Sequence, residues 1–435
     1  MRGGRPALRA FAALIWCGLA SCAVSATVSD SGIGRDGFTT DGSNTADILN
    51  LADHPPSDDR IVTDAPFGDT NPNPAPPREH RLLDAGSLHT CVIRRAGRVW
   101  CWGVNYNGQL GVDSRVANAG LEIVEVPGID DAVELSAGAA FTCALRRTGH
   151  VVCWGDNTYG QRGLGFAGTT ISSGPGPEAT ELGDVLSIES GAEFTCALKT
   201  NGTVSCWGRN DYGQSGPSKS RILPSPSRLS LTGVVELTAG YQHACARDRL
   251  ESTVCWGSNG NGQLGSDAGI VGTSSSQPRS VSGEHRFVEI RGGGGFTCGR
   301  TVDAAWCWGQ NFFQQLGDGS DIDQWLPTRM AWSGTVINIS PGASHVCAQT
   351  PGGGVVCWGR SDSGQTGHGS VEGPSPAIVD GLTGVVGLAL GSTHSCALLE
   401  GDAVVCWGRR GLGLLGDGWY MPFQAQLRPI PVVFP

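Results

Sequence analysis

Cysteine is the most regularly spaced reactive residue in this sequence, and paired thiols can form disulfides, bind a metal ion or act as nucleophiles. Fourteen of the 16 cysteines form seven pairs, and the second member of each pair begins the tripeptide CWG. The pairs are Cys91 and Cys101, Cys143 and Cys153, Cys196 and Cys206, Cys245 and Cys255, Cys298 and Cys307, Cys347 and Cys357, and Cys396 and Cys406.

The residues between paired cysteines indicate a β-hairpin. In the first pair, a three-residue loop of Arg95, Ala96 and Gly97 sets Cys91 opposite Cys101 on adjacent strands. Opposed Cβ atoms lie about 4.5 to 5.5 Å apart, and closer in the non-hydrogen-bonded pairing, and a disulfide needs roughly 3.5 to 4.5 Å. The pattern favours seven disulfides. Packed free thiols or a metal site are the alternatives, although zinc-binding pairs converge from two places and a nucleophile is not needed seven times.

The third residue of this loop should adopt a positive φ, which glycine and aspartate tolerate. The other residues in this position are Gly149, Gly202, Gly353 and Asp402. The fourth hairpin has Glu251 there, and the fifth is one residue shorter. We therefore expect those two hairpins to turn differently.

Two further side-chain sets recur once per repeat. Four histidines share one position (His89, His243, His345 and His394), which could suggest a ring of metal ligands. Phenylalanine occupies the same position in the other repeats, so we interpret it as a packing position. The CWG tryptophans lie on the strand face opposite the cysteines and should pack between units. Asn105 and its four equivalents follow the second cysteine by four residues and should cap turns.

These residues lie on a repeat whose CWG motifs are separated by 49 to 53 residues. Each unit contains four short β-type stretches bounded by glycine-rich turns and no helical periodicity. Residues 81–435 accommodate seven such units, which need their neighbours to bury both faces. The sequence predicts an all-β fold, a seven-bladed β-propeller of four-stranded blades.

The first 80 residues have a different composition. Residues 1–22 resemble a signal peptide, with three arginines before a short apolar run that ends at a lipobox-like Cys22, which would be lipidated. Cleavage after Ala26 is the alternative. Residues 23–80 are rich in Asp, Ser, Gly and Pro and predict a disordered linker. Export to a bacterial cell envelope, as a lipoprotein or a secreted protein, agrees with the cysteine content, because disulfides persist in oxidising compartments.

The repeat pattern, as in AGSLHTCVIRRAGRVWCWGVNYNGQLG, resembles the regulator of chromosome condensation family across residues 81–435. The two-cysteine variant is similar to exported bacterial members. The resemblance implies a seven-bladed propeller. It does not imply the family's nucleotide exchange activity. That activity acts on a small nuclear GTPase, which an exported acidic chain would not meet. The plant photoreceptor of the family has tryptophan after the AG of the repeat, a position that holds Tyr241 in the fourth repeat and tryptophan in none.

The formal net charge of −10 argues against nucleic acid, or an anionic membrane surface, as an electrostatic partner. No motif indicates a cofactor or a metal ion. We therefore expect a non-enzymatic module that binds an envelope or extracellular protein or glycan, and that contacts the membrane only through its lipid anchor. A passive rigid spacer is a weaker alternative.

The variable loops after each GQLG segment are where the repeats differ. Two of these loops contain off-pattern aromatic residues, namely Trp325, Trp332, Trp419, Tyr420 and Phe423. Exposed aromatic residues often anchor partners, so we predict partner binding at Trp325, Trp419 and Tyr420. Local packing of a long loop is the alternative.

A hydrolytic propeller, for example a carbohydrate-active one, is the second functional hypothesis. Asp318, Asp321 and Asp323 beside Trp325 could bind a cation or act as paired acids. The hypothesis requires a cleft with two carboxylates from different blades.

Overall fold

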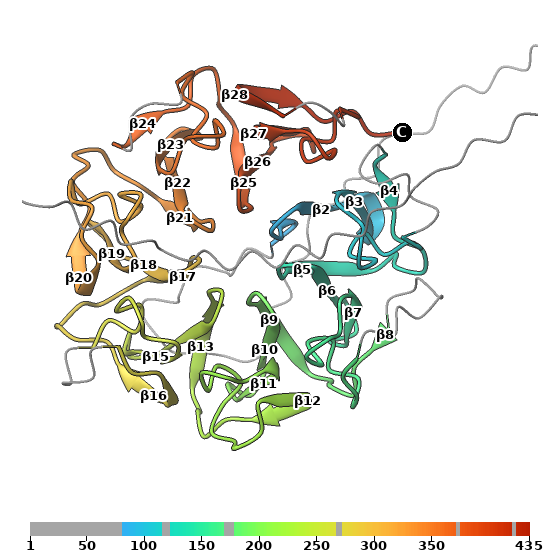
Figure 1. Ribbon diagram of the computed structural model, residues 1–435, viewed down its shortest axis with the longest axis vertical. Helices are drawn as coiled ribbons and strands as arrows, with labels where there is room; N and C mark the ends of the chain where they lie inside the picture. The colour runs from blue at the N-terminus through green and yellow to red at the C-terminus, as the bar shows by residue number, and fades with distance from the viewer. Residues whose placement is uncertain (1–80, 115–121, 169–177, 267–271, 371–374, 420–422) are drawn as a thin grey trace, which may run out of the picture. The chain divides into compact units, whose positions relative to one another are not determined.

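The computed structural model describes residues 81–114, 122–168, 178–266, 272–370, 375–419 and 423–435. Seven antiparallel sheets, each of four strands, surround a centre as the blades of a propeller (Figure 1). The predicted fold class is therefore confirmed. Cys22, the signal peptide and the linker lie outside the described residues and stay predictions. Within the described part of the chain, no helix is long and apolar enough to cross a membrane.

The blades are numbered one to seven in chain order, with the first strand of each innermost. Blades one to four contain β1 (Leu83–Ala85), β2 (His89–Arg94), β3 (Arg98–Gly103), β4 (Val124–Glu125); β5 (Ala132–Ala137), β6 (Phe141–Arg146), β7 (Val151–Gly155), β8 (Glu178–Ala179); β9 (Val185–Ser190), β10 (Phe194–Lys199), β11 (Val204–Arg209), β12 (Ile222–Arg228); β13 (Val234–Ala239), β14 (His243–Asp248), β15 (Thr253–Gly257), β16 (Ser275–Ser280). Blades five to seven contain β17 (Glu289–Gly292), β18 (Phe296–Arg300), β19 (Ala305–Gly309), β20 (Gln324–Arg329); β21 (Asn338–Pro341), β22 (His345–Thr350), β23 (Gly354–Gly359), β24 (Ala377–Ile378); β25 (Val385–Leu390), β26 (His394–Leu399), β27 (Val404–Arg410), β28 (Gln424–Pro431).

The ring closes by packing between the last and first blades rather than by a shared sheet. All four strands of every blade are consecutive in the chain. At the closure, His394 Nε2 lies 2.8 Å from Thr90 Oγ1, and the Trp102 indole donates to the Leu414 carbonyl at 3.2 Å. Contacts of this kind also join the other blades, so the closure repeats the ordinary blade interface.

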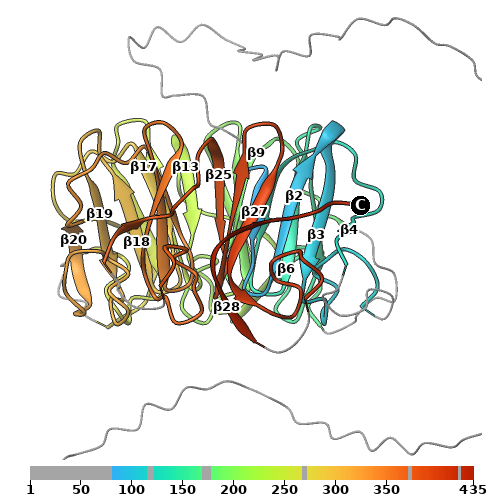
Figure 2. The same ribbon diagram turned by 90° about the horizontal axis from the view of Figure 1, so that it is seen from above.

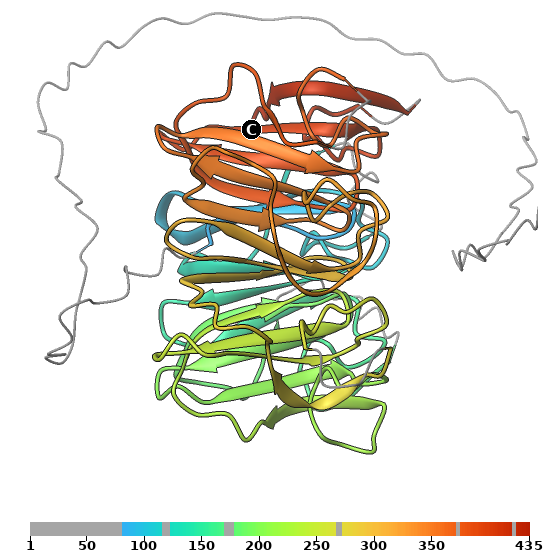
Figure 3. The same ribbon diagram turned by 90° about the vertical axis from the view of Figure 1, so that its left-hand side faces the viewer.

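The strands run between two ends of the ring, which the side views show clearly (Figures 2 and 3). The register pairs His89 with Gly103, so the end of each innermost strand and the loop after each CWG motif lie at the same end. We call this the loop end. The turns between paired cysteines, such as η1 (Arg95–Gly97), lie at the opposite end, which we call the hairpin end.

All seven predicted cysteine pairs are disulfides in the structure. Their Cα atoms lie 4.0 to 4.1 Å apart, and the paired residues face each other across the second and third strands of each blade, as Cys91 and Cys101 do. The fourteen side chains are completely buried. Each disulfide therefore staples one hairpin inside the packed blade.

The expectation that the fourth hairpin turns differently is wrong. Glu251 has a φ of 66°, and its backbone N donates to the Asp248 carbonyl at 3.1 Å. Gly149 makes the same contact with Arg146 in the second hairpin. The disulfides and flanking strands thus impose the common turn on a residue that disfavours it. The fifth hairpin does differ, since Thr301 pairs with Ala304 around a two-residue loop.

We expect Glu251→Gly to stabilise the protein by about 0.5 to 1 kcal/mol, because glycine adopts this backbone conformation without a Cβ penalty. The ion pair that it removes, with the exposed Arg286 at 3.9 Å, contributes little. Urea midpoints would measure the change. Gly149→Glu should destabilise the second hairpin by a similar amount, and a lower midpoint for Glu251→Gly would contradict the prediction.

The CWG tryptophans pack between blades, as predicted, and each also makes a specific hydrogen bond. All seven are nearly completely buried, and each indole nitrogen donates to a backbone carbonyl of the preceding blade at 2.9 to 3.2 Å. The pairs are Trp102 with Leu414, Trp154 with Gln109, Trp207 with Gln161, Trp256 with Gln214, Trp308 with Gln263, Trp358 with Gln315, and Trp407 with Gln365. The GQLG and CWG segments therefore recognise each other across every blade interface.

Candidate functional site

The four repeated histidines are packing residues that also bond the next blade. Each is fully buried, and its Nε2 lies 2.8 Å from a hydroxyl of the following blade. The pairs are His89 with Thr142, His243 with Thr297, His345 with Ser395, and His394 with Thr90. Thr142, Thr297 and Ser395 in turn donate to a backbone carbonyl, so their histidines are the donors. Each histidine therefore pairs with a hydroxyl group across a blade interface, and the four do not form a ring of metal ligands.

Burial strongly disfavours protonation of these imidazoles. It lowers the pKa of His89 and His345 to about 3, with the His394 charge as a smaller cause. It lowers the pKa of His243 and His394 to about 4. The hydroxyl partners were missed in the sequence. A signal existed, because all four histidines precede a blade with Thr or Ser in the facing position, whereas Phe194 and Phe296 precede blades with Ala244 and Val346. Phe141 is the exception, since the next blade has Thr195 in that position.

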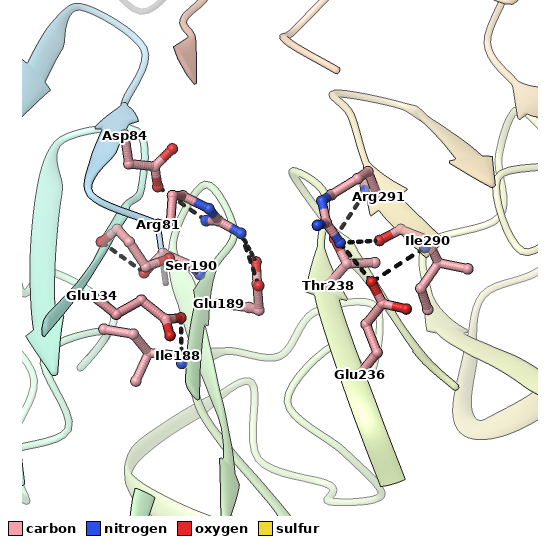
Figure 4. Close-up of polar contacts among 12 residues, drawn as sticks. Arg81, Asp84, Glu134, Ile188, Glu189, Ser190, Glu236, Thr238, Ile290 and Arg291 are labelled. Atoms are coloured by element: carbon pink, nitrogen blue, oxygen red, sulfur yellow. Dashed lines mark hydrogen bonds and ion pairs between the residues drawn. The ribbon is translucent and has the colours of Figure 1, made fainter. Parts of the chain in front are cut away.

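The centre of the ring contains a cavity of about 120 Å³ lined by residues from all seven blades, which we call the channel. Two arginines contribute to its wall (Figure 4). Arg81 reaches from the first blade to the third, where it contacts both carboxylate oxygens of Glu189 at 2.8 and 3.0 Å. It also contacts Asp84 at 3.2 Å. Arg291 contacts Glu236 at 2.6 Å.

Ion pairing dominates the electrostatics of these arginines. Burial alone would lower the pKa of Arg81, but Glu189 and Asp84 outweigh burial and raise it. The pKa of Arg291 is also raised, by Glu289 and Glu236, against the effect of burial. Burial raises the pKa of the Asp84 carboxyl, and Arg81 opposes that shift. Both guanidinium groups therefore stay charged within the channel.

Polar side chains of the innermost strands also cap the free edge of the neighbouring blade. Asp84 accepts from Ala137 N at 2.8 Å, Ser136 accepts from Ser190 N at 2.7 Å, and Thr238 accepts from Gly292 N at 2.8 Å. The equivalent donor position in the sixth blade is Pro341, which has no N–H. The side chain that faces Pro341 is Arg291, which has no hydrogen-bond acceptor and so could not cap an N–H there. Edge capping thus explains most of the polar residues around the channel.

The channel does not favour the hydrolytic hypothesis. Asp84 and Glu189 do come from different blades and line one cavity. However, Arg81 binds both, and Asp84 also caps Ala137 N. Ligand pockets usually measure about 300 to 1,000 Å³, which is well above the volume here. These carboxylates are accounted for by structural contacts.

The aspartates near Trp325 form a turn. Asp318 accepts from Ser320 N at 2.9 Å, and Asp323 accepts from Asn311 N at 2.7 Å and from Asn261 Nδ2 at 2.9 Å. Asp321 is exposed. Within the described ranges, no group of three or more His, Cys, Asp or Glu residues could hold a metal ion. Asn311 and its equivalents accept a backbone N–H five residues later, as predicted for turn caps.

The predicted anchor residues have different environments. Trp325 is half-buried on β20 and packs close to Gly262 of the fourth blade. Trp332 packs against the core. Trp419 is 38% exposed beneath the guanidinium of Arg410, and Phe423 is 60% exposed beneath that of Arg409. Tyr420 lies outside the described residues.

The loop end also exposes aromatic residues that were not predicted as anchors from the sequence. Tyr106 is 60% exposed, Phe312 is 71% exposed and Tyr241 is 37% exposed. Around the mouth of the channel, the residue after the AG glycine is small in six blades: Ser87, Ala139, Ala192, Gly294, Ala343 and Ser392. Tyr241 occupies this position in the fourth blade, and its hydroxyl lies 2.8 Å from Ser392 Oγ of the seventh. Tyr241 therefore crosses the mouth of the channel.

Family models match several parts of this propeller. The regulator of chromosome condensation (RCC1) repeat matches residues 82–109, 132–161 and 185–214, and a second model with the same description matches 96–145 and 303–349. Human E3 ubiquitin-protein ligase HERC2 is 29% identical over 309 residues, which cover 69% of this chain and 5% of HERC2. The Arabidopsis thaliana ultraviolet-B receptor UVR8 is 29% identical over 310 residues, covering 70% of this chain and 58% of UVR8. The chain thus spans less than two thirds of these relatives.

Solved structures with the same fold include Prp20p from Saccharomyces cerevisiae and human WBSCR16. Prp20p has a TM-score of 0.68 at 21% identity, covering 82% of this chain and 88% of its own. WBSCR16 has a TM-score of 0.68 at 23% identity, covering 78% of this chain and 95% of its own. At these identities the similarity establishes the propeller fold.

Proposed function

Because this chain belongs to the regulator of chromosome condensation (RCC1) repeat family, we propose that it is a non-enzymatic module that binds a partner protein through the loop end of its propeller. The partner is a protein of the cell envelope or the extracellular space. The chain is exported, and it is anchored by lipidation at Cys22 or released by cleavage after Ala26. The seven buried disulfides support an oxidising compartment.

The observation that carries this proposal is the concentration of exposed aromatic side chains at one end of the ring. Tyr241 crosses the channel mouth, and Tyr106, Phe312, Trp419 and Phe423 come from loops at the same end. Interfaces are enriched in Tyr, Trp and Arg, and the strongest contacts lie near their geometric centre. Tyr241 occupies such a central place.

Relatives support a protein as the partner. Prp20p was described with its binding properties to Gsp1p and histones, and yeast RCC1 (Prp20) was solved with Kap60 bound to it. These partners belong to those proteins. For this chain they favour protein binding over hydrolysis, and the structural role of the channel carboxylates agrees with that choice.

We expect Tyr241→Ala to weaken partner binding by about 30-fold or more, because truncating a central aromatic residue typically costs at least ~2 kcal/mol. The partner would be captured by cross-linking from the native envelope and identified by mass spectrometry. Its dissociation constant would then be measured for each variant. Trp419→Ala and Trp325→Ala test the two off-pattern tryptophans in the same assay.

Leu250→Ala is the matched control, because Leu250 is highly exposed in the same blade but lies at the hairpin end. It should leave the affinity unchanged. Equal binding by the wild type and all three aromatic variants, or loss of binding only in Leu250→Ala, would exclude the loop end as the binding surface. Capture of no protein would contradict the proposed function.

A further inference from the structure

Three arginines occupy one repeat position at the loop end. Arg209, Arg360 and Arg409 directly follow the CWG motif in the third, sixth and seventh blades. The backbone holds this position in place, since Arg360 N donates to the Ser344 carbonyl at 2.9 Å and Arg409 N donates to the Thr393 carbonyl at 2.8 Å. The three side chains therefore start from equivalent points, and their different partners can be compared directly.

Arg209 and Arg360 have carboxylate partners from their own blades. Arg209 pairs with Glu193 and Asp211, and Arg360 pairs with Asp362 at 2.7 Å. In the seventh blade, the position of Glu193 holds Thr393 and the position of Asp211 holds Gly411. Arg409 therefore has no acidic residue at either of these two positions, and within the described part of the chain it makes no ion pair.

All three arginines lie over an aromatic ring, Arg209 over Tyr159 at 4.8 Å and Arg360 over Phe313 at 4.9 Å. The closest stacking of the three is that of Arg409. Its guanidinium carbon lies 3.5 Å from the centre of the Phe423 ring, and Phe423 is 60% exposed. Stacking leaves the edge of the guanidinium plane, which carries the N–H donors, free to bind a carboxylate with two parallel hydrogen bonds. Arg410 stacks on Trp419 in the same way, but it is already paired with Asp417 at 2.6 Å.

The electrostatic surroundings make an unpaired Arg409 unfavourable. The side chain is half-buried, and burial, followed by the neighbouring positive charge of Arg360, lowers the pKa of Arg409. Asp362 offsets this only in part. Arg409 should gain more from an added carboxylate than Arg209 or Arg360, because those two arginines already form ion pairs.

We propose that Arg409, stacked on Phe423, binds a single carboxylate side chain of the protein partner. This inference rests on the proposed function and specifies the chemistry of that partner. The net charge of −10 disfavours polyanions such as nucleic acid or an anionic membrane. A single carboxylate beside an apolar group satisfies the cation and also covers the exposed Phe423 ring.

Arg409→Gln tests the proposal, and Arg329→Gln is the control because Arg329 is an exposed arginine on β20 with no ion pair among the described residues. The first probe is the captured partner. We expect about 30-fold weaker binding for Arg409→Gln, partial rescue by Arg409→Lys, and less than twofold change for Arg329→Gln. The affinity of Arg409→Gln should also depend less on salt. Binding of Arg409→Gln within twofold of the wild type would overturn the proposal.

A second probe works without the captured partner. It is a labelled peptide with one Glu flanked by Leu residues, compared with the same peptide carrying Gln in place of that Glu. We expect only the Glu peptide to bind, and to do so in an Arg409-dependent manner. Binding of inorganic phosphate or of phosphatidylglycerol vesicles through Arg409, without binding of the Glu peptide, would also overturn the proposal.

The two ideas fail separately. If Tyr241→Ala abolishes capture and Arg409→Gln does not, the proposed function stands and the carboxylate site is wrong. If no protein is captured, the proposed function is wrong, and the peptide measurement still decides whether Arg409 binds carboxylates.

Discussion

Lowering the pH from 7 to 5 is expected to destabilise the propeller by about 2 kcal/mol for each of its four repeated histidines. In the folded protein, burial keeps the pKa of His89, His243, His345 and His394 at about 3 to 4. In the unfolded chain their pKa returns to about 6.5. Below pH 6.5 the unfolded state binds more protons, so the free energy of unfolding falls by ~1.4 kcal/mol per pH unit for each histidine until the folded pKa is reached.

Other groups act in both directions, and burial also lowers the pKa of His285, which adds to the loss of stability. Asp84 acts in the opposite direction, because burial raises its pKa and a raised pKa favours the folded state at low pH. Chemical denaturation at pH 7 and pH 5, followed by tryptophan fluorescence, would measure the difference. An unfolding free energy that does not change between these pH values would contradict the prediction.

A single substitution separates the histidine effect from general acid destabilisation. His243→Phe should cost about 1 kcal/mol at pH 7, because the hydrogen bond to Thr297 is lost. At pH 5 it should be the more stable protein, because it has one fewer imidazole to protonate on unfolding. The second blade has the buried Phe141 in the histidine position, and the next blade has Thr195 in the position of Thr297, so the histidine position accepts phenylalanine. The exposed His150 provides the control site, and His150→Gln shows the effect of removing an imidazole that is not buried.

The native protein is expected to resist thiol reductants, whereas the unfolded and reduced chain should fail to refold. All fourteen paired cysteines are completely buried, so a reductant reaches them only after unfolding. Each disulfide closes a short loop and contributes up to ~3 kcal/mol in the chain-entropy model. Because a folded domain has a net stability of only about 5 to 15 kcal/mol, loss of all seven should abolish folding.

Alkylation followed by intact-mass measurement tests both statements. Under native reducing conditions none of the fourteen paired cysteines should be labelled, and all fourteen should be labelled in denaturant. The control is the oxidised chain, unfolded and refolded without reductant. Native near-ultraviolet circular dichroism from the reduced chain would contradict the prediction. The double variant Cys347→Ala with Cys357→Ala should lose at most ~3 kcal/mol and still fold.

The limits of sequence reasoning are clear at the fourth hairpin and at the blade interfaces. Glu251 suggested a different turn because local preference was considered without the flanking strands. Tertiary constraints overrode that preference. The partners of His243 and Arg81 lie 54 and 108 positions away in the sequence. Nothing local to these residues identifies the partner, although the repeat length points to the facing position in the next blade.

The sequence alone determined the number of blades, the four strands of each, the seven disulfides and the packing role of the histidines and tryptophans. These features depend on the spacing of residues within a unit of about 50 residues, and that spacing recurs in every repeat. Only the tertiary structure decided which residues the ring brings together. The Arg81 ion pair and the crossing of the channel mouth by Tyr241 depend on which blades are neighbours or face each other. Closure of the ring sets that arrangement, because each blade must bury its faces against two others.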